Sequence, residues 1–210
     1  MEVLRVGVGI AFLCTVAGLA LLWRGSKAFG VRAYRARPSG SSARGVAYAF
    51  GAGMLPGAKE SVRTHMSAWA AGVGYHLGVF AALALLLPAL LGLPLPRTMA
   101  LALGLVALLG AACGLGLLLK RAFSPLLRSF SIPDDYLSNA LATAFAALSG
   151  LGALGLLPEQ AALAGAVVLF LYLPLGKIRH CMFFFPTRYH FGTFFGRRGV
   201  LPPARGGARG

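Results

Sequence analysis

Four histidines are the side chains of this sequence best suited to redox or metal chemistry: His65, His76, His180 and His190. His76 and His180 lie within long apolar runs, where an ionisable side chain is costly and indicates a functional site. Two imidazoles that face each other across a helix bundle can bind a haem iron from both sides. The sequence therefore predicts His76 and His180 as axial haem ligands. The alternative is that both histidines only form hydrogen bonds between helices.

The residues near these histidines fit a haem pocket. Gly72 precedes His76 by four residues, and Gly176 precedes His180 by four. Residues four apart share one face of a helix, so each missing side chain would leave room for a flat porphyrin. The cations expected to pair with haem propionates at the polar boundary are Arg63, Lys177 and Arg179.

The two outer histidines allow a second site. His65 lies 11 residues before His76, and His190 lies 10 residues after His180. On antiparallel helices this spacing would bring His65 opposite His190, so a second haem is conceivable. Pro186 is expected to interrupt the helix between His180 and His190 and argues against it. A quinone site or simple interfacial polarity are the other interpretations of this pair.

An acidic pair precedes the fourth apolar run. Asp134, Asp135 and Tyr136 are candidates, with His65 and His190, for a quinone site and its proton exchange. The alternative for the two aspartates is capping, because carboxylates favour the positive end of a helix dipole.

The elements that must position these residues are apolar helices. The chain has 210 residues, of which 58% are hydrophobic and 12% charged. That charged share is about half the usual ~25% and argues against both a disordered chain and an ordinary soluble enzyme. A bilayer span needs ~20 apolar residues. The sequence predicts an all-α membrane protein, a five-helix transmembrane domain over 1–198 with helices at about 4–23, 66–92, 98–119, 134–156 and 161–185, and a basic, disordered tail at 199–210.

The basic residues predict the orientation of this bundle. The net charge is +15, and 18 of the 20 Lys and Arg residues fall on one side of the predicted bundle. Cytoplasmic loops carry such an excess, so the N-terminus is predicted outside and the C-terminus in the cytoplasm. Because these charges follow the ends of the predicted spans, the sequence argues against nucleic-acid binding and for a multi-pass membrane protein with its basic side in the cytoplasm.

Three segments resemble a known family. They are GAKESVRTH…GYHLGVF at 57–80, RSFSIPDDYLSN at 128–139 and PLGKIRHCMFFFPTRYHFGTFFGRRG at 174–199. They resemble the membrane cytochrome b subunits typified by the gamma subunit of respiratory nitrate reductase. The similarity is greatest to the branch paired with heterodisulfide-reductase-like iron–sulfur subunits in the Dsr and Tmc transmembrane complexes of sulfate reducers. In that family the patterns around His76 and His180 correspond to the ligands of the haem nearer the cytoplasm.

The resemblance implies a haem b subunit that passes electrons between menaquinone or another quinone and a cytoplasmic iron–sulfur subunit. Such a subunit works within an oxidoreductase complex rather than as an enzyme alone. The positions that correspond to the family's second pair of haem ligands are Leu86 and Ala162, which cannot bind iron. The resemblance therefore implies one haem, and the quinone site beside the missing one is in doubt. The alternative functions are a haem-free membrane anchor or assembly subunit, or a small transporter.

Overall fold

The computed structural model describes residues 1–30, 36–58 and 60–202, and every regular element in that part of the chain is a helix. The predicted all-α fold class is confirmed. Of the predicted disordered tail, residues 203–210 lie outside the described residues. The elements are α1 (Glu2–Ala28), α2 (Ser42–Phe50), η1 (Ala52–Met54), η2 (Pro56–Ala58), α3 (Glu60–Thr64), α4 (Met66–Leu91), α5 (Arg97–Phe123), α6 (Pro125–Ser129), α7 (Pro133–Ala153), α8 (Glu159–Tyr172), η3 (Lys177–Arg179) and α9 (His180–Arg197).

The chain divides into two compact units, and their positions relative to each other are not determined. Unit 1 comprises Met1–Leu21 and Ser67–Ile178, and unit 2 comprises Leu22–Met66 and Arg179–Gly210.

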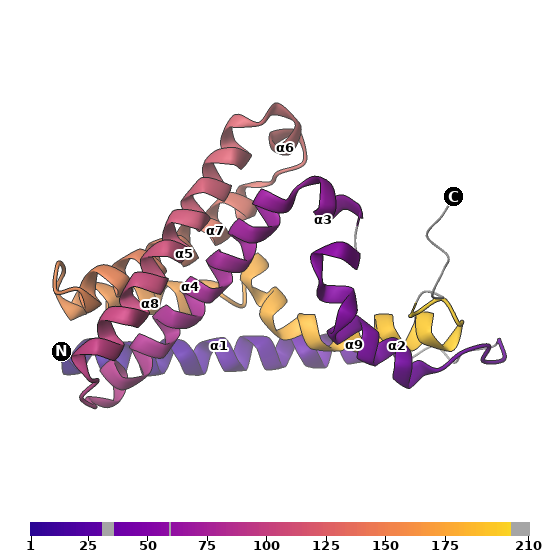
Figure 1. Cartoon of the computed structure of the whole chain (residues 1–210). Helices are drawn as coiled ribbons and strands as arrows, with labels where there is room; N and C mark the ends of the chain where they lie inside the picture. The colour runs from indigo at the N-terminus through magenta and orange to yellow at the C-terminus, as the bar shows by residue number, and fades with distance from the viewer. Residues whose placement is uncertain (31–35, 59, 203–210) are drawn as a thin grey trace. The chain divides into compact units, whose positions relative to one another are not determined.

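The core of unit 1 lies among α1, α4, α5, α7 and α8. Figure 1 shows α5 and α7 side by side, and α8 also packs against α7. The fully buried side chains are mostly small, with Phe145 and Leu163 the largest in this core. Leu86 belongs to it and is only 6% exposed. Leu86 is therefore an apolar side chain in a packed core.

Glycines bring the helices of unit 1 into backbone contact. Gly78 of α4 faces Gly110 of α5, and a Cβ added to Gly78 would lie 3.0 Å from the backbone nitrogen of Gly110. Gly150 of α7 faces Gly104 of α5, and a Cβ added to Gly150 would lie 2.8 Å from the carbonyl oxygen of Gly104. Small residues at crossings are how apolar helices associate where burial alone gives no advantage over lipid.

Three described helices, α1, α4 and α5, are long and apolar enough to cross a membrane. The interrupted pair α8 and α9 makes a fourth if it counts as one span. Helix α7, the fourth predicted span, has 21 residues and is not among these candidates. The structure therefore supports three or four spans by length and composition.

The predicted helix over 161–185 is wrong, because the chain leaves the helical path after Tyr172. Residues 173–176 form a turn, and a new helix begins at His180. Pro174 causes this break, since proline has no N–H to give to the carbonyl four residues earlier and clashes with it. That carbonyl belongs to Phe170, and it accepts a hydrogen bond from the hydroxyl of Thr15 on α1.

Unit 2 contains a close crossing of α2 and α9. A Cβ added to Gly192 would lie 2.5 Å from Cα of Val46, and one added to Gly196 would lie 2.7 Å from Cα of Gly45. Just before α2, the backbone N–H groups of Ser39 and Gly40 each donate to the carbonyl of Arg197 at 3.0 Å. These contacts fix α9 on α2.

Candidate functional site

His76 lies in α4, with an exposed side chain. Its Nδ1 is 2.7 Å from the carbonyl oxygen of Gly72, one turn earlier. A carbonyl only accepts, so Nδ1 carries the proton and the lone pair of the neutral ring is on Nε2. Metal-binding histidines almost always donate their other N–H in this way, which fixes the tautomer and the ring. The hydrogen bond to Gly72 therefore fixes the tautomer and the direction of the ring, and its role as a metal ligand stays a prediction.

Gly72 leaves open space beside this ring. A Cβ added to Gly72 would meet no heavy atom within 4 Å outside its own helix turns. The Cβ position of Gly72 is therefore open, and room for a porphyrin next to His76 stays a prediction.

Tyr75 holds this part of α4 against α7. Its hydroxyl donates to the carbonyl of Asn139 at 2.8 Å and accepts from Thr143 at 3.2 Å. Because successive residues of a helix point about 100° apart, anchoring Tyr75 on α7 determines the direction of His76.

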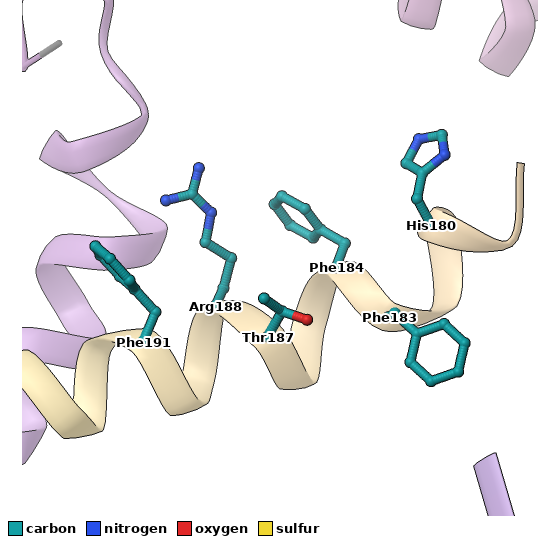
Figure 2. Close-up of a pocket in the computed structure, with 6 residues that line it drawn as sticks. All are labelled: His180, Phe183, Phe184, Thr187, Arg188 and Phe191. Atoms are coloured by element: carbon teal, nitrogen blue, oxygen red, sulfur yellow. The ribbon is translucent and has the colours of Figure 1, made fainter. Parts of the chain in front are cut away.

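His180 begins α9 and lines a groove of about 330 Å³ together with Phe183, Phe184, Thr187, Arg188 and Phe191. Figure 2 shows that His180, Phe184, Arg188 and Phe191 project to the same side of α9, whereas Phe183 points the other way. The four residues are spaced four, four and three apart, which is the spacing of one helix face. All of the groove residues belong to unit 2.

Arg188 and Phe184 make the best-defined contact in this groove. The guanidinium carbon of Arg188 is 5.7 Å from the centre of the Phe184 ring, within the range of a cation–π interaction. Phe50 of α2 packs against the same ring in an edge-on arrangement at 6.2 Å between centroids. The groove therefore combines an imidazole, apolar rings and a positive charge.

His76 belongs to unit 1 and His180 to unit 2. Their pairing across one iron stays a prediction.

Gly176 and Lys177 have other partners than those predicted. Gly176 is in the turn before α9 rather than one helical turn below His180. A Cβ added to Gly176 would lie 2.6 Å from Cζ of Tyr172, so a tyrosine ring fills that space. Nζ of Lys177 is 2.6 Å from Oδ1 of Asp135. The expected porphyrin-sized gap at Gly176 is absent because Pro174 ends α8.

The acidic pair Asp134 and Asp135 lies at the start of α7, within a polar cluster of unit 1. Asp134 accepts hydrogen bonds from Tyr172 and, at 2.8 Å, from Ser138. Asp135 accepts from the N–H of Ile132 at 3.0 Å, which is the capping contact weighed above. Its Oδ1 also lies 3.7 Å from Nη1 of Arg121. These contacts tie the starts and ends of α5, α7 and α8 together.

The remaining predicted residues lie nearer the surface. His65 is an exposed residue in the turn between α3 and α4, and His190 is exposed on α9 with its ring 5.8 Å from that of Tyr189. Arg63 and Arg179 are exposed, and Tyr136 is half-buried. The expected interruption at Pro186 is wrong, because α9 runs through this proline. The helix continues past it with one backbone hydrogen bond fewer.

Sequence reasoning missed Tyr172, Arg121 and Arg188. The first two act through contacts between helices, for which a single sequence carries no signal. Arg188 could have been found, because its spacing of eight residues from His180 marks the same helix face.

No protein-family model, curated protein or solved structure matches this chain. Within the described part of the chain, no group of three or more His, Cys, Asp or Glu side chains could hold a metal ion. Haem needs only one or two axial ligands from the protein, so a search for groups of three or more ligands does not test a haem site.

Proposed function

We propose that this chain is a haem b-binding membrane subunit of a respiratory redox complex. It passes electrons between a quinone, such as menaquinone, and a cytoplasmic iron–sulfur subunit of the heterodisulfide-reductase-like type. It spans a prokaryotic cytoplasmic membrane five times, with the N-terminus outside and the C-terminus inside. His76 and His180 bind the haem iron.

The observation that carries this proposal is the hydrogen bond from His76 Nδ1 to the Gly72 carbonyl. It sets the tautomer that an iron ligand requires and orients the ring, and it does so beside open space.

The residues present fit a haem in their local chemistry. When bound, this group supplies one-electron redox chemistry between its ferric and ferrous states. His76 provides an oriented imidazole, and Tyr75 keeps α4 in the rotation that directs it. His180 opens onto the groove of aromatic rings with Arg188 on the same side.

The proposed membrane topology rests on the lengths of the apolar helices and on the distribution of Lys and Arg. Three described helices meet the requirements of a span, and α8 with α9 adds a fourth. A fifth span requires α7, which lies between α5 and α8 in unit 1 and carries its charged residues only in the first turn. The excess of Lys and Arg on one side then orients the N-terminus outward.

The quinone site is proposed on the cytoplasmic side, with His65 and His190 as the candidates for proton exchange. Asp134 and Asp135 are held within the polar cluster of unit 1, so their contacts favour a structural role.

Purified protein in detergent gives the decisive test. We expect a dithionite-reduced minus oxidised spectrum of a b-type cytochrome with one haem per chain, and a low-spin ferric signal typical of two imidazole ligands in electron paramagnetic resonance. His76→Ala and His180→Ala should each abolish both signals, whereas the exposed controls His65→Ala and His190→Ala should retain them. A well-folded preparation without haem, grown with ample haem supply, would overturn the proposal and favour the haem-free anchor.

A further inference from the structure

Helix α9 presents one face on which an imidazole, two phenyl rings and a guanidinium follow each other: His180, Phe184, Arg188 and Phe191. A ligand that matches this face has a flat apolar body and an anionic group. The groove of about 330 Å³ is open along one side, so it would take the edge of a larger molecule rather than enclose a small one.

Arg188 carries a charge that the described chain does not neutralise. The four ion pairs among the described residues involve Arg5, Arg121 and Lys177, and none involves Arg188. Its side chain is half-buried, and its contact is with the ring of Phe184. A half-buried cation without a carboxylate partner in an apolar groove is expected to attract an anion.

Arg188 also lies within reach of a ligand held at His180. Eight residues separate them, which is about 12 Å along the helix axis at 1.5 Å per residue. Side chains of a helix lean toward its N-terminus, and the position of the guanidinium over Phe184 shortens the gap. A porphyrin with its propionate arms can span this separation.

We propose that Arg188 pairs with a haem propionate in the groove of α9 while His180 binds the iron. This inference rests on the proposed function. Arg188 takes the place of Lys177 as the propionate partner, because Lys177 already pairs with Asp135. Phe184, held by Phe50, supports the guanidinium from below.

The test compares two arginines of the same helix region. Arg198 stacks on Phe194, with 4.1 Å from its guanidinium carbon to the ring centre, but does not line the groove. Arg198→Leu is therefore the matched control for Arg188→Leu, and Arg188→Lys retains the charge. Full-length apoprotein in detergent is titrated with haem and with haem dimethyl ester, in which the propionates carry no charge. The midpoint potential of each haem-loaded variant is then measured.

We expect the wild type and Arg198→Leu to bind haem about 10-fold more tightly than the ester, as one charge-assisted contact predicts. Arg188→Leu should bind the two equally and show a lower midpoint potential, since loss of a nearby positive charge favours the ferric state. Arg188→Lys should lie between the wild type and Arg188→Leu in both the affinity ratio and the midpoint potential. If Arg188→Leu kept both the wild-type preference for haem over its dimethyl ester and the wild-type midpoint potential, the inference would be overturned while the proposed function stayed intact. A wild type that binds neither compound would instead overturn the proposed function.

Discussion

Lys177 and Asp135 form an ion pair in which Nζ lies 2.6 Å from Oδ1. The carboxylate side chain is 11% exposed and the lysine side chain 50%. The other oxygen of Asp135 accepts the N–H of Ile132, so this side chain both caps α7 and binds the turn that follows α8. The pair therefore joins the start of α7 to η3, at the position where the sequence predicts a cation for haem propionates.

This pair should contribute to stability rather than to redox properties. Removing one member leaves the mostly buried carboxylate without its partner, so Lys177→Met should lower the free energy of unfolding by about 1 kcal/mol. Asp135→Asn should cost a similar amount, and the double variant should cost less than the sum. Thermal unfolding in detergent measures these differences. A lower haem midpoint potential in Lys177→Met, with unchanged unfolding, would instead support the propionate role.

The contact between Thr15 and Phe170 predicts a second stability effect. The Thr15 hydroxyl shares its proton between the carbonyl of Phe170, which Pro174 cannot satisfy, and that of Ala11 at 3.0 Å, and the side chain is 4% exposed. Thr15→Val keeps the shape but removes the donor and should destabilise unit 1 by about 1 kcal/mol. Thr15→Ser keeps the donor and should cost less. The Phe170 carbonyl also accepts from the N–H of Leu173 at 3.3 Å, so equal unfolding temperatures for Thr15→Val and the wild type would show that this longer hydrogen bond is sufficient.

Fold class and the first three long helices could be predicted because continuous apolar runs specify helices of bilayer length. Their observed bounds, Glu2–Ala28, Met66–Leu91 and Arg97–Phe123, are close to those predicted. The end of the helix that begins at Glu159 could not be predicted, because a proline in an apolar run can either end a helix or lie within it. Pro174 ends α8, whereas Pro88 and Pro186 lie inside helices. Tertiary contacts decide between these outcomes, and the Thr15 hydroxyl is one of them.

The site was predictable only where it depends on local spacing. His76 and Gly72 are in contact within one helical turn, so their proximity follows from their spacing of four residues in the sequence. Gly176 has the same spacing from His180, but a broken helix separates the two and Tyr172 occupies the space. The ion pair of Lys177 with Asp135 could not be predicted, because the two residues are 42 positions apart in the sequence. The sequence alone therefore left Lys177 as a candidate partner of a haem propionate.

The crossing of α4 and α5 should be intolerant of any side chain. Gly78→Ala adds a Cβ 3.0 Å from the backbone nitrogen of Gly110, and backbone cannot move aside cheaply. We expect a loss of about 1–3 kcal/mol from this overpacking. Gly116→Ala on α5 is the control, because a Cβ there meets nothing within 4 Å and alanine favours the helix. Similar unfolding temperatures for the two variants would contradict a backbone contact at Gly78.

Gly72 separates haem binding from folding most directly. Its Cβ position is open and leucine favours a helix more than glycine does, so Gly72→Leu should keep or slightly raise the unfolding temperature of the haem-free protein. If a porphyrin lies beside His76, the new side chain competes for that space, and the haem content should fall several-fold. Gly9→Leu on α1 places the same side chain at another open position and should keep full haem content. Pyridine haemochrome assays and thermal unfolding measure the two effects. If Gly72→Leu retains its haem, the open side of α4 faces lipid rather than porphyrin, even where His76→Ala shows that the histidine is a ligand.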